Sequence, residues 1–151
     1  MKAQEIMITH VYKVKKHDTV RAVIEKFIDH RISGLPVVNE RNEIVAYISD
    51  GDIMRYIGKH QDLVVDFVYH TAVFKGDIED FESRAHKLLK VPVMEIARKK
   101  VIVVSADEEL EQVAAILGKR QIKKLPVERR GVLVGIISRG DVIRQVFKQM
   151  L

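Results

Sequence analysis

The sequence repeats itself at an interval of about 90 residues, and this repetition constrains the possible folds more than any other feature. Residues 5–37 and 95–127 align without a gap, and nine of the 33 positions are identical. A second match pairs residues 46–52 with 135–141 at an offset of 89, so one residue is missing from the loop between the two matches. The chain is therefore an internal duplication, in which two copies of one structural unit should pack together.

Length and composition describe an ordinary globular protein. With 151 residues, of which 47% are apolar and 31% charged, the chain suffices for one compact core or two mutually dependent units. One repeat alone would bury little apolar surface, so we expect the halves to form one core. No apolar run approaches the ~20 residues that span a bilayer, and the first residues lack a signal-peptide pattern, so we expect a cytoplasmic protein without membrane contacts. The lack of cysteine excludes disulfides and cysteine-based zinc sites.

The positive charge is concentrated in the second half of the sequence. Residues 1–93 contain 14 Lys or Arg and 14 Asp or Glu, whereas residues 94–151 contain 12 and 7, so the second half carries the whole net charge of +5. This asymmetry indicates that an anion, either a phosphate group or a nucleic acid, contacts the second half. A solvated basic surface explains the same numbers equally well.

The first copy predicts the order strand, helix, strand, strand, helix. Alternating apolar residues predict a strand at 11–14, and helical spacing after Asp18, the expected cap, predicts a helix that ends near His30. Two strands at 35–38 and 44–48 form a hairpin that leads into a second helix.

The second copy repeats this plan. Its expected strands are 101–104, 125–128 and 132–137, and its expected helices are 108–118 and 141–150. Ser105 and Glu108 have capping-box spacing at the start of the first of these helices. We therefore divide the chain into a first repeat at 1–58, an inserted connector at 59–91 and a second repeat at 92–151.

The insert has no counterpart in the repeat pattern. Residues 63–74 are apolar and β-branched enough for an extra strand or extended packing segment, and Asp77 is placed to cap a helix after Gly76. Because the segment lacks the Gly, Ser or Pro content of a flexible linker, we expect it to pack and to be partly helical. It is the candidate contact for a separate protein partner, since the repeat symmetry leaves it unexplained.

The motifs of the two halves resemble those of a tandem CBS-domain pair, the module named after cystathionine β-synthase. The resemblance covers residues 1–57 and 94–151 and depends on three features: the lead-in at 6–9, Leu-Pro-Val at 35–37 and 125–127, and Ser-x-x-Asp at 49–52 and 138–141. It implies an α/β (α+β) fold of two β-α-β-β-α repeats, packed sheet to sheet around a pseudo-twofold axis with two clefts between them. Such pairs typically bind adenosine-containing ligands and assemble into dimers.

The Ser-x-x-Asp motif has the groups needed to bind the phosphate and ribose of a ribonucleotide. It places a hydroxyl and a carboxylate at the start of a helix, where unpaired backbone N–H groups favour a phosphate. The serine can donate to a phosphate oxygen, and the aspartate can accept from the two hydroxyls of a ribose. The same residues form a capping box that needs no ligand, and the two roles can coexist.

The two motifs differ in their surroundings. Gly135 permits close backbone approach in the second repeat, whereas Ala46 and the bulky Tyr47 occupy the same stretch of the first. Arg139 would attract a phosphate where Asp50 of the first repeat would repel it. The second repeat should therefore provide the better site, and the first a weak or empty site or one suited to an uncharged nucleoside.

The resemblance assigns candidate ligand contacts in both repeats. The stronger site comprises Lys99, Lys100, Val101, Lys123, Lys124, Leu125, Pro126, Ser138, Arg139 and Asp141. The weaker site comprises Thr9, His10, Val11, Ser33, Gly34, Leu35, Pro36, Ser49 and Asp52. Each Leu-Pro pair marks either an edge that a base can approach or a strand start without a ligand.

The sequence contains none of the common catalytic motifs. The six histidines show no metal-binding spacing, and no nucleophile elbow, Walker loop or dinucleotide fingerprint occurs, so we expect neither an enzyme nor a metal site. A basic nucleic-acid-binding protein is the second reading, although the scattered aromatic residues do not form a stacking platform. A dimerisation scaffold without a ligand is the third.

The sequence therefore predicts a non-catalytic regulatory module that binds an adenine nucleotide. The resemblance leaves the ligand open among AMP, ADP, ATP, NAD, S-adenosylmethionine and a cyclic dinucleotide, and no cofactor is required. We expect a homodimer that acts on a separate protein effector.

Overall fold

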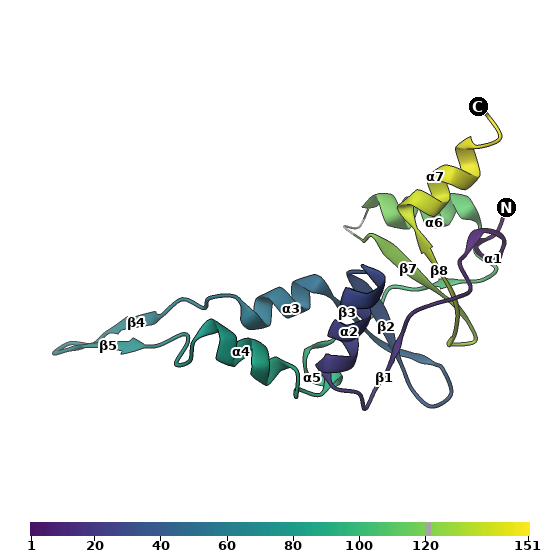
Figure 1. Ribbon diagram of the computed structural model, residues 1–151. Coiled ribbons are helices and arrows are strands. Elements are labelled where there is room, and N and C mark those ends of the chain that lie inside the picture. Colours follow the sequence, from purple (N-terminus) through teal and green to yellow (C-terminus); the bar gives the residue numbers. More distant parts are fainter. Residues whose placement is uncertain (120–121) are drawn as a thin grey trace.

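The computed structural model of the protein describes residues 1–119 and 122–151. Figure 1 shows the two repeats side by side, with the insert projecting from one end of the molecule. The first repeat contains β1 (Val14–Lys15), α2 (Val20–His30), β2 (Gly34–Val38), β3 (Ile44–Ser49) and α3 (Asp50–Ile57). The second contains β6 (Val104–Ser105), α6 (Leu110–Lys119), β7 (Lys124–Arg129), β8 (Val132–Ser138) and α7 (Arg139–Phe147). The predicted α/β fold of two β-α-β-β-α repeats is confirmed.

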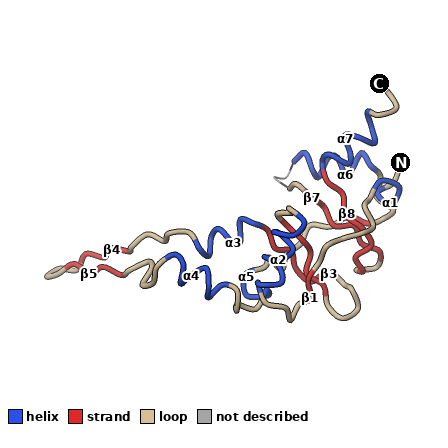
Figure 2. Tube along the Cα trace, viewed as in Figure 1, coloured by secondary structure: helices blue, strands red, loops and turns tan. Residues whose placement is uncertain are grey.

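Each repeat forms its own three-stranded sheet, in the orders β1-β2-β3 and β6-β7-β8 (Figure 2). The first pair of strands in each sheet is parallel and the second is antiparallel. Val37 faces Ala46 in one sheet and Val127 faces Gly135 in the other, with an irregularity in the register directly afterwards in both. The two sheets thus have the same strand register at the positions that the duplication in the sequence aligns.

A short lead-in helix precedes each repeat, and each packs into the opposite repeat. Ala3 and Ile6 of α1 (Ala3–Ile6) belong to the apolar core of the second repeat, whereas Val93 of α5 (Val93–Ile96) belongs to the core of the first. The protein therefore has two interlocked cores rather than the single shared core that we expected. The number of cores was predicted wrongly because the exchange of lead-ins lets each repeat complete its own core.

Backbone hydrogen bonds fix this exchange in a reciprocal way. Ile8 and Ile136 exchange N–H···O bonds of 2.9 Å in both directions, and Tyr47 and Arg98 do the same. Because Arg98 is the repeat counterpart of Ile8, and Ile136 that of Tyr47, the two contacts are related by the duplication. Neither repeat can be separated without removing a strand neighbour and a core helix from the other.

Gly135 of β8 lies in close contact with the segment that follows α1. A Cβ on Gly135 would lie 2.9 Å from Cβ of Met7, in the segment that follows α1. The group that uses the space at this glycine is therefore the lead-in chain, packed over β8.

Several predicted element starts were wrong. The N-cap of α2 is Thr19, while the carboxylate of Asp18 accepts from the Lys15 N–H at 2.8 Å and closes the preceding turn instead. The strands β1 and β6 are two residues long, because the residues before them cross between the repeats rather than pair in a sheet. Helix α6 begins at Leu110, and the Ser105 hydroxyl accepts from the Asp107 N–H, so Ser105 and Glu108 do not form its capping box.

The insert forms a β-hairpin followed by a helix. Strands β4 (Leu63–Asp66) and β5 (Thr71–Phe74) pair antiparallel and project from the molecule, and α4 (Phe81–Leu88) returns along α3 (Figure 1). We call residues 59–80 the arm. Our expectation that the whole insert packs holds for α4, but the hairpin stays in solvent. Helix α4 is capped by Asp80, which accepts from the Ser83 N–H at 2.8 Å, and not by Asp77, whose carboxylate is held by His60.

The described residues contain no candidate for a membrane-spanning helix and no candidate for a metal site. Among residues 1–119 and 122–151, no helix has the length and apolar character that a bilayer crossing requires. Within the same ranges, no three His, Asp or Glu side chains gather closely enough to hold a metal ion.

Candidate functional site

A cavity of about 510 Å³ lies between the two repeats, and we call it the central cleft. Its volume is within the range of about 300–1,000 Å³ that is typical of small-molecule sites. Both repeats contribute to its lining, which consists of Ser33, Gly34, Tyr47, Ser49, Asp50, Arg98, Lys100, Val101, Ile102, Ile122, Lys123, Lys124, Pro126, Ser138, Arg139 and Gly140.

The Ser-x-x-Asp turn of the second repeat joins β8 to α7 and forms a capping box. The Asp141 carboxylate accepts from the Ser138 N–H at 2.8 Å and from the Arg144 guanidinium at 2.8 Å, and the Asp141 N–H donates to the Ser138 hydroxyl oxygen at 3.1 Å. Because this hydroxyl accepts from the backbone, its own proton can still be donated to a ligand oxygen. Asp141 is buried, and each of its carboxylate oxygens retains acceptor capacity beyond the bonds described.

The corresponding turn of the first repeat uses its serine differently. The Asp52 carboxylate accepts from the Ser49 N–H at 2.9 Å and also from the Ser49 hydroxyl at 3.3 Å. Arg55 pairs with the same carboxylate. The Ser49 proton therefore points to Asp52, whereas Ser138 keeps its proton available, and the two motifs are not equivalent as phosphate donors.

Arg98 links the two repeats by an ion pair. Its Nε lies 3.5 Å from Oδ1 of Asp52, so the lead-in of the second repeat reaches the acid of the first repeat's motif. Arg98 also lines the cleft, and its side chain is 66% exposed. An anion in the cleft would compete with Asp52 for this guanidinium.

The charge of the cleft is strongly positive. Its described lining contains five cationic side chains and one carboxylate, that of Asp50. Three of the cations, Lys123, Lys124 and Arg139, surround the second motif, and the strand register sets Lys124 directly opposite Ser138. The Arg139 guanidinium also donates to the Leu117 carbonyl at 2.8 Å, at the end of α6. This arrangement suits a phosphate group, for which clustered cations and helix-start N–H groups act together.

The cleft also has apolar lining residues. These are Val101, Ile102, Ile122 and Pro126, and a flat aromatic base could pack against such side chains. The Tyr47 ring lies over Gly34, where a Cβ would be 3.0 Å from the ring. Burial raises the pKa of Tyr47 to about 12, with a smaller contribution from the Asp50 charge, so the phenol stays protonated.

The cleft contains part of each predicted site. From the stronger site it includes Lys100, Val101, Lys123, Lys124, Pro126, Ser138 and Arg139, and from the weaker site it includes Ser33, Gly34 and Ser49. We expected two clefts, and the structure brings residues of both predicted sites into one.

The other predicted residues lie outside the lining. Leu35 and Leu125 are fully buried in the two cores, and Pro36 is buried in the middle of β2. Asp141 lies behind Ser138 within its capping box, and Asp52, within the corresponding box, lines the second cavity described below rather than the central cleft. Four lead-in residues are also outside the cleft, namely Thr9, His10, Val11 and Lys99.

Some cleft residues belonged to neither predicted site. Assigning residues repeat by repeat overlooked the contributions that cross from one repeat to the other. These residues are Tyr47, Asp50, Arg98, Ile102, Ile122 and Gly140. Two sequence signals point to part of this set: the basic run at 98–100 contains Arg98, and the Ser-x-x-Asp motifs contain Asp50 and Gly140.

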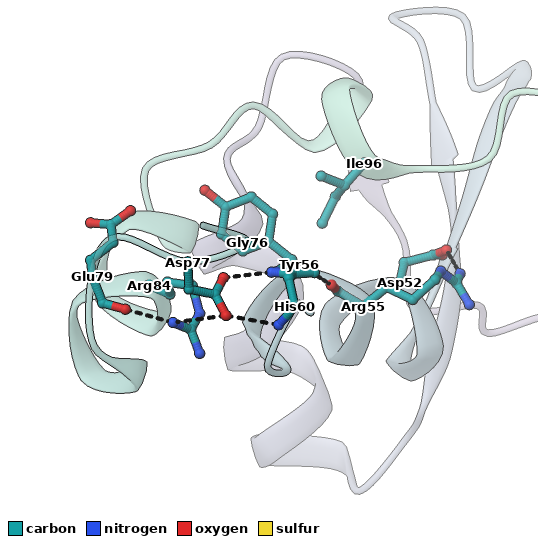
Figure 3. A pocket seen from close by; sticks show the side chains of 9 residues that line it. All are labelled: Asp52, Arg55, Tyr56, His60, Gly76, Asp77, Glu79, Arg84 and Ile96. Carbon is teal, nitrogen blue, oxygen red and sulfur yellow. Dashed lines mark hydrogen bonds and ion pairs between the residues drawn. The ribbon is translucent and has the colours of Figure 1, made fainter. Parts of the chain in front are cut away.

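A second cavity, of about 490 Å³, lies where the arm joins the first repeat (Figure 3). Figure 3 shows Asp77 between His60 and Arg84, and Asp52 beside Arg55, whereas the Glu79 carboxylate points away from this group. His60 Nδ1 lies 2.7 Å from an Asp77 oxygen, and the Arg84 guanidinium donates to the Glu79 carbonyl at 2.7 Å. These internal contacts indicate a structural joint rather than a ligand site.

The comparison with known families identifies the fold. A family model described as "CBS domain" matches residues 3–59 and 93–148. The chain belongs to the CBS-domain family. The two matched segments form a tandem pair, which confirms the family resemblance of the sequence motifs. CBS pairs are in general non-catalytic regulatory modules, and the segments matched here are CBS repeats.

Individual relatives cover nearly the whole chain. The "Uncharacterized protein MJ1426" of Methanocaldococcus jannaschii is 32% identical over 95% of this chain and 89% of its own length. The crystal structure of CBSX2 of Arabidopsis thaliana in complex with AMP has a TM-score of 0.72 at 22% identity, covering 99% of this chain and 98% of that one.

A further solved structure contains two adenosine compounds. The CBS domain pair of protein MJ0100, in complex with 5-methylthioadenosine and S-adenosyl-L-methionine, has a TM-score of 0.66 at 19% identity and covers 99% of this chain and 98% of that one. At these identities, the likeness of the two solved structures to this chain establishes the fold.

Proposed function

We propose that this CBS pair is a regulatory module that binds an adenosine-containing ligand with at least one phosphate group in the central cleft. The observation that carries the proposal is the combination of five cationic and four apolar side chains in the lining of a cavity of about 510 Å³. CBS pairs solved with AMP, or with S-adenosyl-L-methionine and 5-methylthioadenosine, support the adenosine component.

The residues of the second repeat have the principal roles in this proposal. The base packs against Val101 and Pro126, and the phosphate is held by Lys123 and the α7 N-terminus with the Ser138 hydroxyl. The Asp141 carboxylate lies behind Ser138, and it accepts from the ribose with the acceptor capacity that its bonds to the Ser138 N–H and to Arg144 leave, when the sugar binds deep against this turn. The first repeat contributes the other part of the lining, and its own site is weaker because Tyr47 covers Gly34 and the Ser49 proton points to Asp52.

Regulation follows from the position of the cleft between two interlocked units. A ligand can shift their relative packing only if it binds one arrangement better than the other. The ligand phosphate competes with Asp52 for Arg98, which gives the two arrangements different affinities. A separate protein effector, a homodimer and a cytoplasmic location are part of this proposal.

The test is a thermal-shift panel of AMP, ADP, ATP, NAD, S-adenosylmethionine and cyclic di-AMP, with inorganic phosphate and duplex DNA as controls. A ligand present at a hundredfold excess over its dissociation constant stabilises the folded state by about 2.7 kcal/mol. We expect at least one adenosine compound to raise the unfolding temperature of the wild type, and Lys123→Glu to abolish the shift. Lys148→Glu makes the same charge change outside the cleft and should leave the shift intact.

Two outcomes would refute the proposal. One is a panel in which none of the phosphate-bearing compounds AMP, ADP, ATP, NAD and cyclic di-AMP stabilises the protein. The other is stabilisation by DNA alone that weakens steeply with salt, which would favour the nucleic-acid-binding reading.

A further inference from the structure

The arm exposes an unusual amount of apolar surface. Val68 is 89% exposed and Tyr69 is 96% exposed. The other exposed large apolar residues of the arm are Leu63, Val64, Phe67, Val73, Phe74 and Ile78. With typical side-chain areas, these residues expose on the order of 1,000 Å², which is comparable with the ~800 Å² that each partner buries in a standard protein interface.

A hairpin of this kind needs a further strand or a covering surface. An isolated pair of strands is marginally stable in water, and its two edges leave backbone N–H and C=O groups without strand partners. On one face of this hairpin Leu63 is paired with Phe74 and Val65 with Ala72, so that face is wholly apolar. This composition is typical of a strand pair inside a larger sheet.

The arm is anchored rigidly at its base. The buried Arg84 donates to the Ile57 carbonyl at 3.1 Å, and the Asp77 carboxylate accepts from the His60 N–H at 2.7 Å (Figure 3). Asp62 accepts from the Gly76 N–H at 3.1 Å and so joins the two strands above this point. These bonds tie the base of the hairpin to the end of α3.

The hydrogen-bond pattern shows which groups are available at each edge. The Phe67 N–H donates to the His70 carbonyl, which makes these two residues a hydrogen-bonded pair. Because such pairs alternate in an antiparallel ladder, Val64 and Val73 form a non-hydrogen-bonded pair, and their N–H groups point away from the hairpin. Val64 belongs to the edge of β4 and Val73 to that of β5.

The two edges differ in charge. Asp62 and Asp66 flank the edge of β4. Two copies of β4 paired antiparallel about Val64 would set Asp62 opposite Asp66 twice, which is destabilising. The edge of β5 has no charged residue between Thr71 and Phe74, and pairing about Val73 would set Lys75 opposite an uncharged Thr71. Charged side chains therefore block the edge of β4 and leave that of β5 open.

We propose that two copies of this chain dimerise through their arms, with β5 pairing antiparallel to β5 of the second copy about a twofold axis at Val73. This pairing is self-complementary and closes after two chains, whereas pairing of β4 with β5 of another copy would continue without limit. It sets Phe74 against Ala72 of the second copy and extends the hairpin to a four-stranded sheet. The inference deepens the homodimer component of the proposed function and is independent of nucleotide binding.

Two proline variants test the edge assignment, with molecular mass measured by light scattering. Val73→Pro removes an outward N–H from β5, and Val64→Pro makes the matched change directly across the hairpin on β4. We expect a dimer for the wild type and for Val64→Pro, and a monomer for Val73→Pro. A monomeric wild type, or a dimer that survives Val73→Pro, would overturn the proposal.

A cysteine variant gives a second readout that does not depend on weakening the hairpin. The chain has no cysteine, and hydrogen-bonded residues across an antiparallel pair have Cα atoms about 5.5 Å apart, within disulfide range. Under mild oxidation we expect Val73→Cys to form a covalent dimer and Val64→Cys to stay monomeric on a denaturing gel. Equal cross-linking of both variants, or of neither, contradicts the register.

The outcomes separate the two proposals. A β5 dimer that binds no adenosine compound supports the arm interface and refutes the ligand site. Nucleotide binding by a protein that is monomeric, or dimeric through another surface, supports the ligand site and refutes the arm interface.

Discussion

Nε of Arg98 lies 3.5 Å from Oδ1 of Asp52 and thereby joins the lead-in of the second repeat to the acid at the start of α3 in the first. The backbone of Arg98 also bonds to Tyr47 in both directions at 2.9 Å. One residue of the lead-in thus touches the first repeat's strand, its Ser-x-x-Asp motif and the central cleft. Because Arg98 contacts both the cleft and Asp52 of α3, a ligand bound in the cleft can change the contacts at the start of α3. The arm follows the end of this helix.

Replacement of Arg98 by alanine should affect ligand binding more than stability. The ion pair with Asp52 is largely exposed on the arginine side, so its loss should cost less than about 1 kcal/mol of unfolding free energy. Loss of a charge-assisted hydrogen bond to a phosphate should weaken nucleotide binding about tenfold, as measured by calorimetry. Arg21→Ala, on α2 and outside the cleft lining, is the control. A change in stability without a change in affinity would contradict the role of Arg98 in the cleft.

The two aspartates of the motifs should be separable by function. Asp52→Ala and Asp141→Ala each remove a capping box and should lower the unfolding free energy by similar amounts, about 1 kcal/mol. Affinity for the adenosine ligand should fall at least tenfold for Asp141→Ala and much less for Asp52→Ala. Calorimetric titration of both variants measures this difference. Equal losses of affinity would refute the ranking of the two repeats.

The joint of the arm should depend on pH. The pKa of His60 is raised above 6.5, first by its hydrogen bond to the Asp77 carboxylate and next by that to the Arg55 carbonyl, while the bond from His60 is the largest cause of the lowered pKa of Asp77. Protonated His60 therefore stabilises the fold fully below about pH 6.5, and this contribution is lost as the pH rises through the raised pKa. Acidification through the lowered pKa of Asp77 removes the contribution of its carboxylate.

The measurement compares the unfolding temperatures of the wild type and His60→Gln across pH. We expect the wild type to exceed the variant clearly below about pH 6.5 and the difference to shrink as the pH rises through the raised pKa of His60. His86→Gln, an exposed change on α4, should not reproduce this pattern. A difference that is constant with pH would show that His60 acts through packing alone.

Two glycines should respond to alanine with opposite signs. A Cβ on Gly135 would collide with Met7, so Gly135→Ala should destabilise the protein by about 1–3 kcal/mol and loosen the docking of α1. Gly118 lies in α6, and among the described residues no atom apart from its chain neighbours and its own helix backbone lies within 4 Å of an added Cβ, so Gly118→Ala should stabilise the protein by about 0.5–1 kcal/mol. Chemical denaturation measures both changes. Neutral behaviour of Gly135→Ala would contradict the close packing of the lead-in on β8.

The predictable features were those encoded locally or by repetition. The element order and the two Ser-x-x-Asp turns follow from periodicity and from matching positions such as Ser49 and Ser138. The exchange of α1 and α5 could not be read this way, because Ala3 contacts residues more than 100 positions away and no local pattern encodes its partner.

The predictions that were wrong concern contacts that residue type alone does not determine. Apolar, β-branched residues such as Val64 and Val73 predict a buried segment, although in this chain they form a solvent-exposed arm. Asp18 and Asp77 have the chemistry of helix caps but are engaged by the Lys15 N–H and by His60. Tyr47 and Arg98 enter the cleft through contacts between repeats, which a comparison of each repeat with its twin does not show.

A crystal structure of the protein soaked with the phosphate-bearing adenosine compound that stabilises it most tests the central claim most directly. We predict density for the nucleotide in the central cleft, with the base against Val101 and Pro126 and the phosphate beside Lys123 and the start of α7. A cleft filled by its own side chains at a saturating concentration of that compound, or a nucleotide bound elsewhere on the molecule, would contradict the account.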